Sequence, residues 1–146
     1  MKRATVYLRK HAIYIHSSSA TTAGVWVLTS PCVKLERDCS ERQIGEQALR
    51  ALAESKTGLP HPREWGSVLE PLLRLANVKS WSEFARPASC AEIEEEGGRL
   101  SVVRTENLGA QEGFRAVPQG PTLVESLVQE VVGAAVRQAL LPLPSR

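Results

Sequence analysis

The sequence predicts an α+β fold, with a largely antiparallel (possibly mixed) sheet of about five to seven strands packed with three to four helices. Runs rich in β-branched and aromatic residues open the chain and return after residue 89, and helical apolar periods fill the middle and the C-terminal part. The 146 residues are 42% hydrophobic, without an internal repeat or linker. We therefore expect one domain over residues 1–146, with a loose tail from about residue 142.

Two short strands are predicted at the start, over residues 4–9 and 12–16. Lys10 and His11 separate them, which indicates a hairpin even though this pair lacks the Gly or Asn that tight turns favour. In the second strand, alternation puts two isoleucines on one face and a tyrosine and a histidine on the other. The first sheet face is therefore expected to be apolar and the second mixed.

A hydroxyl-rich stretch, HSSSATTAGVW, follows over residues 16–26. A phosphate-binding loop needs several glycines and a lysine, and this stretch has only Gly24 and no lysine. We interpret it as a loop whose hydroxyls bond its own backbone. A third strand is expected over residues 25–28, and a fourth over residues 33–36 after Pro31.

Helical patterns occupy the middle of the chain. Ser40 and Gln43 form a capping box at the start of a first helix, which we expect to end at Gly58 and Pro60. A second helical pattern begins at Pro62. Because a proline cannot donate a backbone hydrogen bond, Pro71 predicts a kink or break near Glu70. A short turn follows, opened by a capping box of Ser80 and Glu83.

The C-terminal third predicts a hairpin and a last helix. Residues 90–96 and 99–104 flank a Gly-Gly pair, which is a strong hairpin signal, and residues 113–117 could add a strand. Thr122 and Glu125 are read as a capping box that opens a wide apolar helix running to about residue 139. This helix could pack on the sheet or against a second copy of the chain, as a scaffold subunit would.

The charge balance argues against a dedicated nucleic-acid binder, because the net charge is only +2. The nearest approach to a basic cluster is Lys2, Arg3, Arg9 and Lys10, which we read as solvated strand ends. The three cysteines show no metal-ligand spacing, so no metal or cofactor is expected. We found no signal peptide and no membrane-spanning run, which favours a cytoplasmic protein without membrane contact.

Histidines are the candidates for catalysis. A small metal-independent nuclease or phosphate-handling enzyme could use two of His11, His16 and His61 as acid and base. His11 and His16 are expected at opposite ends of one strand and on opposite faces, so their spacing does not pair them. We therefore predict no catalytic residue and keep the enzyme, using His16 or His61, as the alternative.

The acidic run EIEEE is the candidate interaction surface. Glu92, Glu94 and Glu96 should share one strand face, with Glu95 on the other. Such a run is either a solvated sheet edge that discourages aggregation or a patch for a cationic partner. The three tryptophans carry a similar ambiguity between core and interface, with core the more common fate.

Three stretches suggest a family: TTAGVW, PHPREW and VKSWSEF. In their order along residues 4–117, the chain resembles the immunity proteins of bacterial contact-dependent growth inhibition (CDI) systems. The resemblance implies a cytosolic protein that binds the toxic C-terminal domain of its cognate CDI toxin as a heterodimer. Such toxins are often nucleases, commonly acting on RNA. The implied mechanism is stoichiometric inhibition without turnover, and Glu92, Glu94, Glu95 and Glu96 are our candidate contacts from charge alone.

Overall fold

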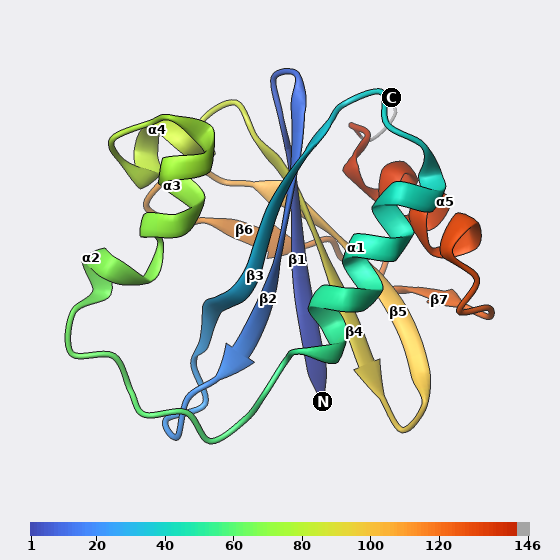
Figure 1. Ribbon diagram of the computed structural model, residues 1–146, viewed down its shortest axis with the longest axis horizontal. Helices are drawn as coiled ribbons and strands as arrows, with labels where there is room; N and C mark the ends of the chain where they lie inside the picture. The colour runs from blue at the N-terminus through green and yellow to red at the C-terminus, as the bar shows by residue number, and fades with distance from the viewer. Residues whose placement is uncertain (143–146) are drawn as a thin grey trace.

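A seven-stranded sheet with helices on both faces forms the molecule in the computed structural model, which describes residues 1–142 (Figure 1). The strand order is β3-β2-β1-β4-β5-β6, with β7 also paired to β5, and every strand pair is antiparallel. The predicted α+β class is confirmed. The strands are β1 (Lys2–Arg9), β2 (Ala12–Ala20), β3 (Trp26–Glu36), β4 (Ser89–Glu96), β5 (Arg99–Asn107), β6 (Phe114–Ala116) and β7 (Thr122–Val124). The helices are α1 (Glu41–Ala53), α2 (Trp65–Val68), α3 (Glu70–Ala76), α4 (Trp81–Ala85) and α5 (Gln129–Leu140).

The first hairpin is as predicted. Arg9 pairs with Ala12, so Lys10 and His11 form a two-residue turn. Lys10 adopts a left-handed φ of 56°, which substitutes for the missing glycine at a modest conformational cost. Ile13 and Ile15 face α1 and α5, whereas Tyr14 packs on the opposite face of the sheet.

Two expectations for the next segment are wrong. The predicted third and fourth strands are one strand, β3, which bulges where Ser30 and Pro31 have no partner in β2. The serines of the hydroxyl-rich stretch lie within β2 and are buried, instead of forming a loop. The loop is shorter: Thr21 accepts hydrogen bonds from the backbone N–H groups of Ala23 and Val25. Ser18 and Ser19 fit this buried strand because their hydroxyls find partners in Thr5 and Thr29, whereas the Ser17 hydroxyl has none among residues 1–142.

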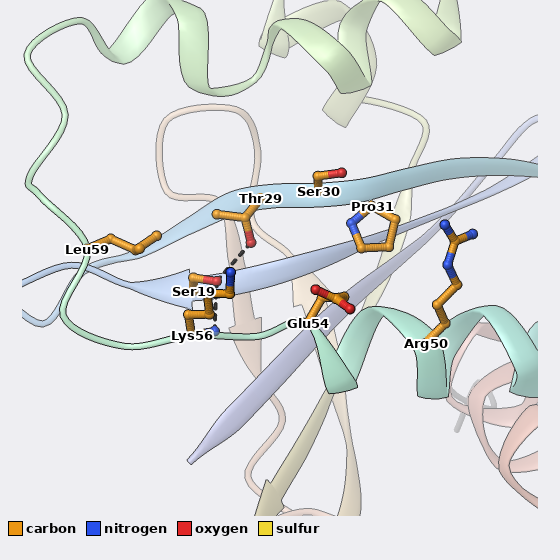
Figure 2. Close-up of a pocket in the computed structure, with 8 residues that line it drawn as sticks. All are labelled: Ser19, Thr29, Ser30, Pro31, Arg50, Glu54, Lys56 and Leu59. Carbon is orange, nitrogen blue, oxygen red and sulfur yellow. Dashed lines mark hydrogen bonds between the residues drawn. The ribbon is translucent and has the colours of Figure 1, made fainter.

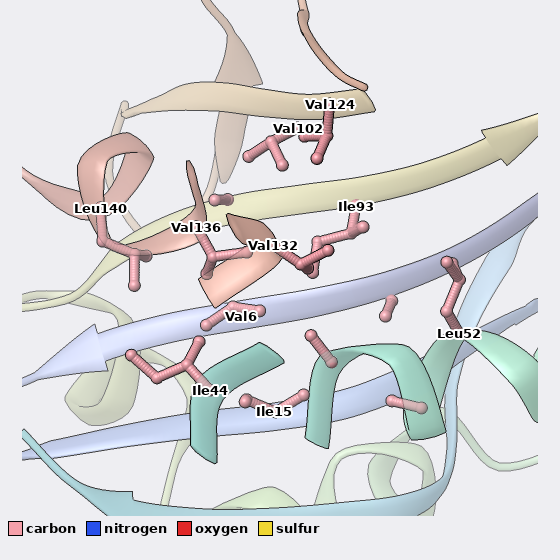
Figure 3. Close-up of a cluster of buried hydrophobic side chains, with 14 of the residues drawn as sticks. Val6, Ile15, Ile44, Leu52, Ile93, Val102, Val124, Val132, Val136 and Leu140 are labelled. Atoms are coloured by element: carbon pink, nitrogen blue, oxygen red, sulfur yellow. The ribbon is translucent and has the colours of Figure 1, made fainter. Parts of the chain in front are cut away.

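The main core lies between the sheet and the pair α1–α5 (Figure 3). α1 begins at the predicted capping box, with Ser40 and Gln43 bonding reciprocally. It ends at Ala53, earlier than expected, because the following segment bonds to the end of β2: Ala20 N donates to Lys56 O. The buried side chains of this core come from five strands and both helices: Val6, Ile15, Ile44, Leu52, Ile93, Val102, Val124, Val132, Val136 and Leu140.

The predicted start of the last helix is wrong. Thr122, Leu123 and Val124 form β7 because their backbone pairs with β5, where Val124 becomes buried. α5 begins only at Gln129, so Glu125 plays no capping part. Val132, Val136 and Leu140 of α5 pack on the sheet and α1, whereas Leu127, Val128 and Val131 of the predicted apolar face stay exposed. The predicted loose tail lies almost entirely outside the described residues.

The other sheet face carries α2, α3 and α4 (Figure 1). The predicted break occurs at Leu69, between α2 and α3, and gives one helix more than expected. Pro62 precedes α2 and is not helical, contrary to expectation. Ser80 caps α4 by accepting from Glu83 N, as predicted. Within residues 1–142, we find no helix with the length and apolar character needed to span a bilayer.

Candidate functional site

Three polar rows cross the centre of the sheet on the face of α2–α4. Antiparallel pairing of β2, β1 and β4 puts directly opposite residues on the same face. Groups far apart in sequence thereby become immediate neighbours. The rows are Ser18–Arg3–Glu94, His16–Thr5–Glu92 and Tyr14–Tyr7–Cys90.

A pocket of about 340 Å³ lies against the first two of these rows. Its tryptophans come from three elements: Trp26 from β3, Trp65 from α2 and Trp81 from α4. Trp65 is 48% exposed, and the other two are half-buried. The expectation that tryptophan is core holds in part for Trp81, which packs against Phe84, and is wrong for Trp65. Only the tertiary fold brings the three rings together. The sheet adds Arg3, Thr5, Tyr7, His16, Ser18 and Glu92 to the lining.

Glu92 lies in the interior of this site. Thr5 Oγ1 donates to Glu92 Oε2 over 2.7 Å, and the Thr5 and Ser18 hydroxyls are also 2.7 Å apart. Burial raises the pKa of Glu92 to about 7, because the loss of hydration outweighs the stabilising effects of Thr5 and Arg3 on the carboxylate. The side chain is therefore poised to gain or lose a proton near neutral pH.

His16 lines the same pocket on the far side of Thr5 and has a hydrogen-bond acceptor without a partner among residues 1–142. Nδ1 lies 2.8 Å from the Ser17 carbonyl oxygen, so this nitrogen carries the proton and donates. Burial lowers the pKa of His16 to about 4, which leaves the ring neutral at pH 7. Nε2 is then an acceptor, and it has no hydrogen-bond partner among residues 1–142.

Arg3 is held at the pocket instead of extending into solvent. Its Nη2 donates to Glu94 Oε1 over 3.2 Å, and its guanidinium lies 4.6 Å from the centre of the Trp26 ring. Arg9 is also buried and donates to the Phe84 and Glu83 carbonyls at the end of α4. The solvated strand-end interpretation is therefore wrong for both arginines.

The four candidate acidic residues divide between two environments. β4 lies between β1 and β5, so the sheet-edge interpretation of this run is wrong. Glu92 and Glu94 belong to the pocket rows, whereas Glu96 is exposed beside the hairpin turn. Glu95 is half-buried opposite Lys2. The structure therefore separates one pair of carboxylates inside the site from one pair nearer the surface.

The histidines do not form an acid–base pair in this arrangement. His16 is buried and is not an imidazolium at neutral pH, and its one ring proton, on Nδ1, is donated to the Ser17 carbonyl, so it is not a general acid. His61 is exposed, with its Nδ1 3.4 Å from Thr21 Oγ1 and its ring edge-on to Trp65. His11 lies in the first hairpin turn. Across residues 1–142, no three potential metal-ligating side chains come together.

A second pocket, of about 370 Å³, flanks the hydroxyl-rich stretch (Figure 2). The Ser19 hydroxyl lies 2.8 Å from that of Thr29 and accepts a hydrogen bond from Lys56 N, as Figure 2 shows. Ser19 is thus engaged in joining β2, β3 and the segment after α1. Because the Ser19 hydroxyl already bonds to protein groups, this stretch does not act as a phosphate-binding loop, as the sequence predicted.

The thiols are unreactive in character. Cys32, Cys39 and Cys90 are all free. Burial raises the pKa of Cys32 to about 11 and that of Cys90 well above its ordinary value, so both stay protonated at neutral pH.

Comparison with known proteins gives a consistent result. The family model described as CDI immunity protein matches residues 2–141. A protein of unknown function from Neisseria meningitidis superposes with a TM-score of 0.78 at 19% identity, covering 95% of this chain and 93% of that chain. A chain of the CdiA-CT/CdiI toxin and immunity complex from Yersinia pseudotuberculosis superposes with a TM-score of 0.76 at 16% identity, covering 95% of both chains. No curated protein matches the sequence.

Proposed function

Because the chain belongs to the CDI immunity protein family, we propose that it neutralises the C-terminal toxin domain of its cognate CDI system by tight stoichiometric binding. The family match over residues 2–141 carries this proposal. The fold shared with a chain of a toxin and immunity complex supports it, since that chain is covered to 95%. The chain acts as an inhibitor without turnover.

We also propose the activity of this toxin: it is a nuclease that cleaves RNA, as the family resemblance implies. A cytoplasmic site of action goes with it, because the inhibitor must meet the toxin where cellular RNA lies. Three free cysteines suit a reducing compartment. The exposed aromatic rim at Trp65 is the kind of surface that anchors a protein partner.

The test uses the C-terminal toxin domain of the cognate CDI toxin. Mixed with the purified chain, it should form a 1:1 complex with a dissociation constant in the nanomolar range or below, about 12 kcal/mol of binding free energy. RNA cleavage by the toxin should stop at an equal molar ratio. The control is a toxin domain of similar size from an unrelated system, which should stay active. Absence of a complex, or RNA cleavage by this chain alone, would overturn the proposal.

A further inference from the structure

We propose that the pocket lined by Trp26, Trp65 and Trp81 receives one basic side chain, arginine or lysine, of the bound toxin domain. This inference rests on the proposed function and names the chemistry of one contact. The observation behind it is that hydrogen-bond acceptors and aromatic rings line the same pocket.

The acceptors come from the middle polar row. His16 Nε2 is buried, lines the pocket with its ring and has no partner among residues 1–142. The Nε donor of Arg3 is also without a partner there, but Glu94 already offsets the charge of that guanidinium. Glu92 lies in the same row, separated from His16 by Thr5. A buried acceptor without a partner is destabilising, so a ligand that brings N–H donors gains free energy by satisfying it. Guanidinium and ammonium groups carry several donors and no acceptor.

The tryptophans favour a cation in the same place. A positive group near an indole face is attracted by the ring electrons, and the attraction grows as water is excluded. Arg3 already uses Trp26 in this way, which leaves Trp65 and Trp81 for an incoming group. The lining residues of the helical side, Val68 and Leu69 among them, carry no charge.

The charge balance permits a second cation. Glu94 pairs with Arg3 and offsets its charge, so the incoming group meets Glu92. The other titratable groups facing Glu92 are Arg3 and Tyr7 of β1, His16 of β2, and Cys90 and Glu94 of β4. Burial holds Tyr7 and Cys90 protonated and His16 neutral at neutral pH. Glu92 is thus the group whose charge changes on binding.

This gives the contact a pH dependence. With the Glu92 pKa at about 7, the carboxylate fraction rises about tenfold between pH 6 and pH 8. A ligand that needs the carboxylate should bind about tenfold tighter at pH 8. A ligand attracted by Arg3 would bind no better, or worse, as the pH rises.

The direct test titrates the intact chain with Nα-acetyl-arginine methylamide and Nα-acetyl-lysine methylamide, followed by the indole N–H signals in ¹H–¹⁵N spectra. At least one should bind with a millimolar dissociation constant and move the Trp65 and Trp81 signals. Nα-acetyl-citrulline methylamide, which is neutral and of similar shape, should bind at least fivefold more weakly. Glu92→Gln should remove the pH dependence and weaken binding, whereas Glu96→Gln, on the same strand outside the pocket, should change neither. Equal binding of the citrulline compound, stronger binding of acetate, or no binding would overturn the proposal.

A second measurement separates this inference from the proposed function. Glu92→Gln and Trp81→Ala should each weaken the complex with the cognate toxin domain by at least tenfold, with Glu46→Gln, at an exposed position of α1, as the matched control. If the toxin binds all variants equally, the pocket is not a toxin contact, although the proposed function stands. If the arginine compound binds but the toxin domain does not, the proposed function is wrong. The pocket lined by Trp26, Trp65 and Trp81 is then still a binding site for cations.

Discussion

Gly45 of α1 lies against Gln129 of α5 so closely that a Cβ atom at Gly45 would overlap the Gln129 carbonyl oxygen and stand 2.6 Å from its carbonyl carbon. Gly133 of α5 makes the reciprocal approach to Glu41 of α1. Each helix therefore offers a glycine to the backbone of the other. This pair of contacts sets the spacing of the two helices over the main core.

We expect Gly45→Ala to lower the free energy of unfolding by about 3 kcal/mol, because the methyl group meets backbone that cannot rotate away and the helices must separate. Chemical denaturation followed by circular dichroism measures this. Gly66→Ala is the matched control: Gly66 is also helical, and a Cβ there meets nothing within 4 Å. It should not be destabilising. A Gly45→Ala protein as stable as the control would show that the helix pair is not constrained at this point.

The sequence predicts local structure well where both partners of a hydrogen bond belong to the same short segment. Ser40 and Gln43 cap α1 as expected, since both groups belong to the same turn. Thr122 and Glu125 have an equivalent pattern but are not helical, because the backbone of β7 finds a partner in β5, which no local pattern reveals. Tertiary hydrogen bonds outweigh a capping preference of about 1 kcal/mol.

The same distinction applies to the candidate site. Strand alternation correctly separates Glu92 from Glu95 on the two faces of β4. Nothing local indicates that Glu92 would stand beside Thr5 and in one row with His16, since these residues come from three strands. The tryptophan pocket was missed for the same reason. One usable signal was the single-face spacing of Glu92 and Glu94 in the predicted strand.

Ser55 fastens the segment after α1 to the sheet. Its hydroxyl donates to the Ser18 carbonyl and accepts from the Arg3 backbone N–H over 3.0 Å, and the side chain is buried. Ser55→Ala leaves both backbone groups without this partner, so we expect a loss of about 2 kcal/mol in the free energy of unfolding. Ser67→Ala, which removes one exposed hydroxyl bond, should cost less than about 0.5 kcal/mol. Equal stability of the two variants would mean that water replaces Ser55 without loss.

Glu92 and His16 should make opposite contributions to the pH dependence of stability. The pKa of Glu92 rises from 4.5 to about 7 on folding, so the native state keeps a proton that the unfolded chain releases, and stability falls as pH rises through this window. The pKa of His16 falls from 6.5 to about 4, so its contribution is lost as pH falls through that range. The two effects offset each other between about pH 4.5 and 6.5.

Glu92→Gln should separate these effects. Because Gln imitates the protonated acid and can still accept from Thr5, the variant should gain on the order of 2 kcal/mol relative to the parent between pH 4.5 and pH 7.5. This is less than the full linkage energy because Glu92 keeps some solvent contact. Urea unfolding at a series of pH values measures it, with Glu96→Gln as the control. A difference between variant and parent that does not change with pH would contradict the assignment.

Half-buried Glu95 and exposed Glu96, at the end of β4, are used to test the acidic contribution to toxin encounter. Our sequence-based interface included Glu92 and Glu94, but replacing these with lysine would disturb Thr5 and Arg3 inside the pocket and confuse folding with binding. Glu95→Lys with Glu96→Lys avoids this. Because exposed charges steer association more than they fix affinity, we expect association to slow roughly fivefold at low salt and its salt dependence to flatten. Stopped-flow mixing with the toxin domain measures both, and Glu46→Lys on α1 is the control. An association rate equal to that of the control would remove this pair from the interface.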